Sequence, residues 1–251
     1  MSLDACAGLV QRGDPDRFLA VMAAPVAVRA QLLPLYAFNL EVARAPWVTQ
    51  EPLIAEMRLQ WWRDVVENAA SGAARAHEVA GPLHALIRDF GLPVEVLDRL
   101  IAARRWDIHR EPHEGIAGLA AYLDDTGAGL MWLAARALGA PEGAEHAVRS
   151  YGWATAAAFY LRAVPDLVAR GRRPLPEGIG AADLARLGLE RLAEARQARR
   201  SVPRGIAPAL LAGWQTEALL RQALAGESSS LQLPEFQRRW RLLWQGLTGR
   251  W

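Results

Sequence analysis

Apolar residues recur at helical spacing through almost all of this 251-residue chain. After Pro52, for example, Ile54, Met57, Trp61 and Val65 fall on one face of a helix, at i, i+3, i+7 and i+11. Stretches in which apolar and polar residues alternate, which would indicate strands, are absent from the sequence. The spacing therefore predicts an all-α protein in which these residues face the core.

Glycine and proline residues divide this pattern into separate helices. The predicted helices cover approximately residues 82–90, 116–138, 142–168, 181–199, 208–224 and 234–247, with another that begins near Pro93. Small residues cluster at 127–129 and 154–158, where they favour close helix packing over space for a ligand. No linker, repeat or low-complexity tract interrupts the chain, so residues 1–251 are predicted to form one helical domain.

Charge and cysteine content exclude several functions. The formal net charge is only +2, and all 29 basic residues are arginine without a continuous basic stripe, so nucleic-acid binding is not expected. Cys6 is the only cysteine, which rules out an intramolecular disulfide and a cysteine-based zinc site. His109 and His113 are four residues apart, but Pro112 would disrupt the helix needed to align them. We therefore expect structural or surface roles for the histidines.

The distribution of apolar residues also bears on localisation. No charge-free apolar run reaches the roughly 18 residues of a membrane-spanning helix, and no arginine-led apolar leader begins the chain. We expect a cytoplasmic protein, and peripheral contact with the inner membrane remains open.

The C-terminal segment combines aromatic and basic residues. Phe236, Trp240, Leu243, Trp244 and Leu247 share one helical stripe, and the neighbouring arginines lie off it. This pattern is typical of an interfacial membrane helix, but it also suits a final helix that packs its stripe onto the bundle. We favour packing on the bundle, and name Trp240 and Trp244 as candidate membrane or partner contacts.

Three sequence blocks occur in a characteristic order. The first contains LYAFN at 35–39 and EPLIAEMRLQWWRD at 51–64, the second has Tyr122 and TGAG at 126–129, and the third contains LRAVPD at 161–166 and RGRRPLP at 170–176. Together they resemble the squalene/phytoene synthase family over nearly the whole chain. The resemblance implies an isoprenoid-synthase-type helical bundle.

Acidic residues are missing where the family resemblance implies them. Catalytic members carry two aspartate-rich motifs that hold Mg²⁺ against a prenyl diphosphate. The replacements in this chain are Ala43, Arg44 and Trp47 at the first motif and Ala163 and Leu167 at the second, where Asp166 alone is acidic. Mg²⁺ requires oxygen ligands, which the replacing side chains do not offer. We therefore predict no catalytic residues, no metal ligands and no cofactor, with Mg²⁺ expected only if the chain is an enzyme after all.

The residues in two of these blocks indicate one branch of the family. LRAVP and EPLIAEMRLQWWRD are similar to a non-catalytic branch of the family that includes respiratory complex I assembly factors. This resemblance implies a protein that acts near a respiratory membrane, with a respiratory-complex subunit or assembly intermediate as its partner.

Three functions remain open at this point. The favoured one is a non-catalytic complex I assembly or maturation factor. The others are an active prenyl transferase that joins prenyl diphosphates with unusual metal ligation, and an isoprenoid- or lipid-binding module. Candidate ligand-pocket residues are Tyr36, Asn39, Arg58 and Arg162, each of which also suits a buried structural polar group.

Overall fold

Helices are the main secondary structure of the described residues, as the periodicity predicts. The computed structural model describes residues 3–70, 72–109, 111–226 and 231–251, and no strand occurs among them. The α-helices are α1 (Leu3–Gly13), α2 (Pro15–Ala23), α3 (Arg29–Arg44), α4 (Pro52–Glu67), α5 (Ala80–Phe90), α6 (Val94–Ala103), α7 (Trp106–His109), α8 (Gly115–Leu123), α9 (Gly129–Ala137), α10 (Glu145–Ala169), α11 (Ala181–Gln197), α12 (Ala207–Leu210), α13 (Thr216–Leu224) and α14 (Glu235–Thr248). The prediction of an all-α bundle is confirmed.

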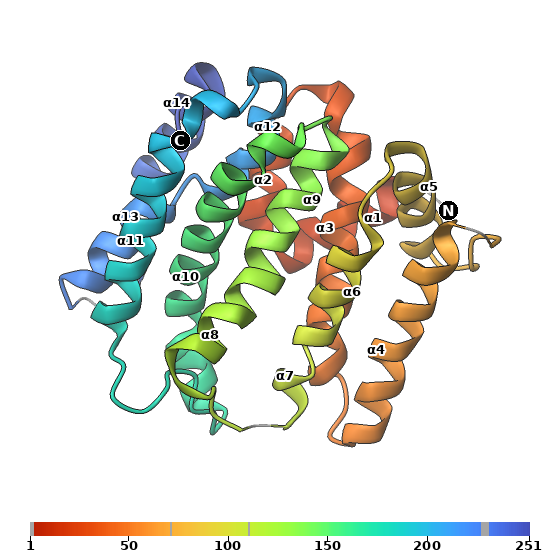
Figure 1. Ribbon diagram of the computed structural model, residues 1–251, viewed down its shortest axis with the longest axis horizontal. Coiled ribbons are helices and arrows are strands. Elements are labelled where there is room, and N and C mark those ends of the chain that lie inside the picture. Colours follow the sequence, from red (N-terminus) through yellow and green to blue (C-terminus); the bar gives the residue numbers. More distant parts are fainter. Residues whose placement is uncertain (1–2, 71, 110, 227–230) are drawn as a thin grey trace.

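The 25-residue helix α10 runs through the middle of the bundle. Figure 1 shows α11 and α13 on one side of it and α8, α9, α3 and α6 on the other. Phe38, Leu97 and Leu133, from three of these helices, are fully buried in a core that continues across the molecule. The elements therefore share one hydrophobic core.

Helix α4 forms where predicted but buries a different face. Met57 is 64% exposed, whereas Leu59, Trp62 and Val66 are buried. With Ala55, these three residues form a second stripe at i, i+4, i+7 and i+11, and that stripe packs on the bundle. The prediction that Met57 faces the core is wrong, because the sequence contains two apolar stripes and periodicity alone does not rank them.

Two central segments approach each other closely because they lack side chains at the contact. The π-helical segment η4 (Asp124–Ala128) joins α8 to α9 and packs against α10. A Cβ atom added to Gly127 would lie 2.2 Å from Cβ of Ala156, and one added to Gly152 would lie 2.8 Å from Cα of Ala128. Both distances are far below van der Waals contact, so the small residues serve close packing, as the sequence favours.

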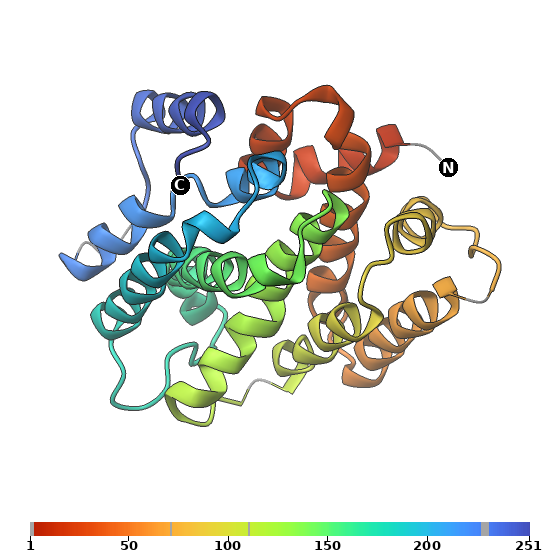
Figure 2. The ribbon, with the colours of Figure 1, turned by 45° about the horizontal axis from the view of Figure 1, so that its top comes forward.

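The C-terminal helix α14 lies at the periphery of the bundle (Figure 2). Its apolar stripe is exposed, with 51–78% of the surface of each residue accessible: Phe236, Trp240, Leu243, Trp244 and Leu247. The opposite face carries the half-buried Leu242 and the buried Gln245, whose amide donates to the Leu210 carbonyl at 3.1 Å. The expectation that α14 packs its stripe onto the bundle is wrong, because polar contacts attach the other face.

No helix in the described part of the chain is long and apolar enough to cross a membrane.

Substitution of Gly127 by alanine tests the central contact. We expect Gly127→Ala to lower the free energy of unfolding by about 2 kcal/mol or more, because the new methyl group overlaps Ala156 and the helices must separate. The matched control is Gly143→Ala, where an added Cβ meets nothing within 4 Å and stability should be unchanged or slightly raised. Urea unfolding followed by circular dichroism measures both, and equal stability of the two variants would contradict the role of Gly127.

Candidate functional site

The positions of the two expected acidic motifs face each other at one end of the bundle. The first lies where α3 passes into the 3₁₀ helix η2 (Ala45–Trp47), and the second lies at the end of α10 and in the loop after it. The guanidinium carbons of Arg170 and Arg172 lie 5.2 Å and 5.0 Å from the Trp47 ring centroid. The two positions are therefore joined by cation–π contacts.

The Arg172 side chain is buried between aromatic rings. Its guanidinium also lies 5.7 Å from the ring of Trp106, and it donates a hydrogen bond to the backbone carbonyl of Asp107. These contacts hold the loop after α10 against α7. Burial of a guanidinium is costly unless it is hydrogen-bonded and paired, so this arginine has a fixed position in the fold.

An aromatic cluster surrounds this arginine, and we define it as Trp47, Trp106, His113, Tyr122 and Tyr160. The rings of Trp106 and His113 stack, with centroids 3.9 Å apart and an angle of 8° between planes. Tyr122 packs edge-on against Trp106 at 5.4 Å and lies 6.0 Å from Tyr160. Such pairs add specific geometry to the burial of large apolar surfaces, so the cluster is a rigid packed unit.

Hydrogen bonds fix the protonation of His113 inside this cluster. The Tyr160 hydroxyl donates its single proton to the Pro174 carbonyl at 2.7 Å. His113 Nε2, 3.2 Å from the same hydroxyl oxygen, must therefore be the donor in that contact. Burial lowers the pKa of His113 to about 4, so the ring is neutral near pH 7 with its proton on Nε2.

A buried carboxylate lies beside the cluster. The Tyr122 hydroxyl donates to Oδ2 of Asp107 at 3.0 Å, and Nη1 of Arg104 donates to the Tyr122 oxygen at 2.7 Å. Burial raises the pKa of Asp107, against the opposing effect of Arg104 and the Tyr122 hydrogen bond. This carboxyl is thus engaged by its own neighbours inside the protein.

The residues present do not fit an Mg²⁺ site. Trp47, Ala163 and Leu167 offer no oxygen ligand, and two guanidinium groups occupy the space over Trp47, where they repel a cation. Arg44 is exposed and lies against Gly13 of α1. Among the residues that the structure describes, no group of three or more acidic, histidine or cysteine side chains is arranged to hold a metal ion.

A cleft of about 650 Å³ opens beside Trp47. Its walls include Glu51, His109, Arg170 and Arg172. His109 contacts Oε1 of Glu56 through Nε2 at 3.3 Å and lies apart from His113. The cleft therefore combines cationic and aromatic groups with the carboxyl groups of Glu51 and Asp107.

The structure places the four predicted pocket residues in different surroundings. Tyr36 is buried beneath the Arg17 guanidinium at 5.1 Å, burial raises its pKa to about 12, and it borders an interior cavity of about 30 Å³. Asn39 is also buried, and its side-chain oxygen has no hydrogen-bond partner. Arg58 is exposed and lines a separate surface pocket of about 200 Å³ with Glu41. A cavity of 30 Å³ holds roughly one water molecule.

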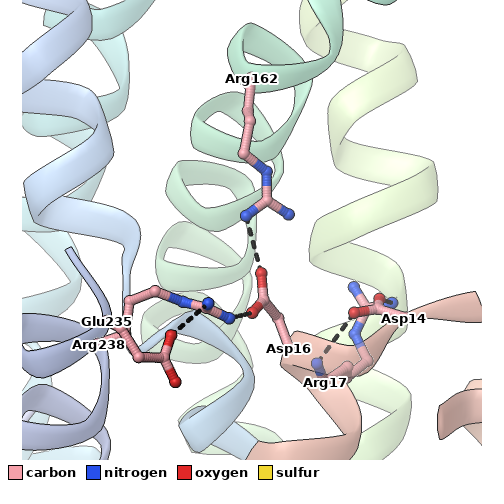
Figure 3. A network of polar contacts seen from close by, with 6 residues as sticks. All are labelled: Asp14, Asp16, Arg17, Arg162, Glu235 and Arg238. Atoms are coloured by element: carbon pink, nitrogen blue, oxygen red, sulfur yellow. Dashed lines mark hydrogen bonds and ion pairs between the residues drawn. The ribbon is translucent and has the colours of Figure 1, made fainter. Parts of the chain in front are cut away.

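Arg162 takes part in a polar network that links three helices (Figure 3). Its Nη1 donates to Asp16 Oδ2 at 2.8 Å, and Arg238 donates to Oδ1 of the same carboxylate at 2.5 Å. Arg238 also pairs with Glu235 at 2.8 Å. Burial would raise the pKa of Asp16, but the charge and hydrogen bonds of Arg162, with help from Gln215 and Arg238, hold it below its usual value.

Sequence reasoning missed the importance of Asp16 and Arg238. They are 222 positions apart, and no local pattern distinguishes either from a solvated charge. The neighbouring Asp14 side chain caps α2 by accepting from the Arg17 amide at 2.9 Å.

Removal of the Asp16 charge tests the network. We expect Asp16→Asn to lower the free energy of unfolding by about 2 kcal/mol near pH 7, because two charge-assisted hydrogen bonds are weakened and two arginines lose their partner. Because the folded pKa is lowered, this contribution is present above about pH 4 and is lost as the pH falls through the folded pKa. The control is Asp89→Asn, which removes an exposed pair with Arg88 and should cost little. Equal effects in urea unfolding would contradict a special role for Asp16.

His113 gives the protein a second pH dependence. Its folded pKa of about 4 lies below the unfolded value of about 6.5, so the unfolded state binds the proton first and stability falls as the pH drops from 6.5 to 4. The expected loss is at most about 3 kcal/mol. His113→Gln should flatten this part of the profile, and His109→Gln should not, because His109 is exposed. A His113→Gln profile as steep as that of the wild type would refute the assignment.

Solved structures share this arrangement of helices. A dehydrosqualene synthase, crystallised with a ligand, superposes with a TM-score of 0.83 over 99% of this chain and 97% of its own, at 14% identity. The squalene synthase HpnC of Alicyclobacillus acidocaldarius gives a TM-score of 0.76 over 91% of this chain and 94% of its own, at 19% identity. At these identities the likeness establishes the fold, which is that of an isoprenoid synthase.

Curated relatives carry a different name. NADH dehydrogenase (ubiquinone) complex I, assembly factor 6 of Bos taurus is 28% identical over 237 residues, covering 85% of this chain and 70% of the relative. The protein of that name in Homo sapiens is 27% identical over 69% of this chain, and the Drosophila melanogaster homolog is 30% identical over 67%. The chain spans only about half the length of the human and fly relatives, 53% and 52%.

The family itself is established by a match over most of the sequence. Residues 10–245 fit the family model described as Squalene/phytoene synthase, and this range contains all three sequence blocks. The resemblance inferred from those blocks is confirmed, and the chain belongs to the squalene/phytoene synthase family.

Proposed function

We propose that this chain is a non-catalytic family member that acts in the assembly of respiratory complex I. We call the end of the bundle where the two motif positions meet the motif end. The observation that carries the proposal is that Trp47 stands there at an expected aspartate position and contacts Arg170 and Arg172 through its ring. Relatives that are named complex I assembly factor 6 support the second half of the proposal.

The chemistry of prenyl condensation explains why this observation matters. Ionisation of an allylic diphosphate releases a multiply charged anion, which enzymes stabilise with metal ions held by several carboxylates. At this end of the bundle Asp107 is buried and already engaged by Tyr122 and Arg104. The guanidinium groups of Arg170 and Arg172 lie on the faces of tryptophan rings. Among the described residues, no cluster of carboxylates beside them could hold a metal ion.

The pocket that Tyr36 borders gives the other two functions little support. A prenyl transferase must accommodate long apolar chains, and a lipid-binding module needs a cavity of several hundred Å³. The interior cavity that Tyr36 borders measures about 30 Å³, and its walls include the closely packed Gly127 and Gly152. Ligand binding by Tyr36 and Arg162 stays a prediction from the sequence, and so does peripheral attachment to the inner membrane.

Deletion of the gene in the organism that encodes it tests the assembly role. We expect less assembled NADH dehydrogenase on blue native gels and lower NADH:ubiquinone activity in membranes, both restored by a plasmid copy. Succinate dehydrogenase serves as the control, because its level should not change. Normal amounts of assembled NADH dehydrogenase in the deletion strain would rule out this role.

An assay with the purified protein tests the non-catalytic half separately. With Mg²⁺ and farnesyl or geranylgeranyl diphosphate, we expect no condensed product and no release of diphosphate above a protein-free blank, because Asp166 is the only acidic residue at the motif positions. Product formation that Mg²⁺ stimulates would show that the chain is an enzyme, whatever the outcome of the deletion experiment.

A further inference from the structure

Helix α14 presents an aromatic stripe directly away from the bundle. With about 3.6 residues per turn, its five exposed apolar residues lie on one side, opposite Gln245 and Arg238, which attach the helix. Arg239 and Arg241 lie off the stripe, on either side of it, and both are exposed. An apolar centre flanked by arginines is the arrangement of a helix that lies in a membrane interface.

An arginine-rich groove adjoins the C-terminal end of this helix. The groove has a volume of about 860 Å³ and contains no aspartate or glutamate in its walls. Its charged residues are Arg196, Arg199, Arg200, Arg204 and Arg250. Leu247 belongs both to the exposed stripe and to the wall of the groove, so the two features form one continuous surface. Figure 1 shows α12 and α14 at the opposite end of the bundle from α7 and the motif positions.

Several of these arginines are available to an outside anion. Arg196 pairs with Glu217 at 2.7 Å, and Arg199 donates to the carbonyl of Gly249 at 2.7 Å. Arg200, Arg204 and Arg250 are exposed, and the described residues provide none of them with an ion-pair partner. The positive charges of these three arginines can therefore attract a negatively charged surface.

The composition of the stripe favours a membrane over a protein partner. Along a helix of 14 residues, about 21 Å long, its five exposed apolar side chains form one narrow band. Two tryptophans and flanking arginines on so narrow an area match the apolar-to-polar boundary of a bilayer, where aromatic rings concentrate.

We propose that the α14 stripe and the arginine groove form a docking surface for an anionic phospholipid bilayer. The apolar side chains enter the boundary between headgroups and acyl chains, and Arg200, Arg204 and Arg250 contact lipid phosphates. This places the motif end of the bundle away from the membrane, exposed to the aqueous phase. The proposal stands apart from the assembly role, because it concerns lipid binding by the purified protein.

Vesicle flotation with the full chain tests the proposal. We expect binding to phosphatidylcholine vesicles containing roughly 30% phosphatidylglycerol, weaker binding to pure phosphatidylcholine, and loss of binding in high salt. Trp240→Ser with Trp244→Ser should lower the partition coefficient at least about tenfold, since both side chains are more than half exposed and their loss leaves the core intact. Arg200→Gln with Arg204→Gln should lower it about tenfold on the anionic vesicles only.

Matched variants control for lost apolar area and lost charge. Leu53→Ser with Met57→Ser removes exposed apolar area from α4, and Arg88→Gln with Arg186→Gln removes two charges elsewhere; both should bind like the wild type. Circular dichroism checks that each variant is folded.

Three results would overturn the proposal. One is no binding to either vesicle type, and another is an equal loss of binding in the α4 variant. The third is a change of oligomeric state in the tryptophan variant, measured by light scattering, while vesicle binding stays the same; that result would assign the stripe to contact between protein chains.

Discussion

The contact between Gly127 and Ala156 sets the separation of the two central helical segments, and the state of the interior follows from it. Because neither Gly127 nor Gly152 carries a side chain, η4 and α10 lie against each other backbone to backbone. The pocket that both glycines line beside Tyr36 has a volume of about 30 Å³, far less than a prenyl chain occupies. The fold is shared with isoprenoid synthases, and in this chain the two central segments pack backbone to backbone at that point.

At the motif end of the bundle, cation–π contacts stand where the family resemblance implies carboxylates that bind Mg²⁺. Asp166 is the only carboxylate left at the expected positions, and guanidinium groups lie beside them on the faces of tryptophans. Neutral His113 stacks on Trp106, and the Asp107 carboxyl is engaged from within. Each of these interactions ties one helix or loop to another, so together they connect α7 to α8 and to the loop after α10.

Local features of the sequence predicted most helices and the family, because helices bury apolar stripes and the family blocks are short and contiguous. Sequence reasoning failed where two solutions satisfied the same pattern. Helix α4 has two apolar stripes, and Leu59 rather than Met57 was buried. The face of α14 that contacts the bundle carries Arg238, which bonds Asp16, 222 positions away in the sequence. No pattern within a single helix encodes such a contact. The partner of Arg162 could not be predicted for the same reason, because Asp16 lies far from it in the sequence.

The attachment of α14 differs in kind from that of the helices around it. Core helices are held by apolar burial, which salt affects little, whereas α14 combines the partly buried Leu242 with the Asp16–Arg238 pair and the amide of Gln245. The polar part of this attachment depends on ionic strength and on the protonation of Asp16. Because the same carboxylate also accepts from Arg162 of α10, one ionisable group couples the C-terminal helix to the centre of the bundle.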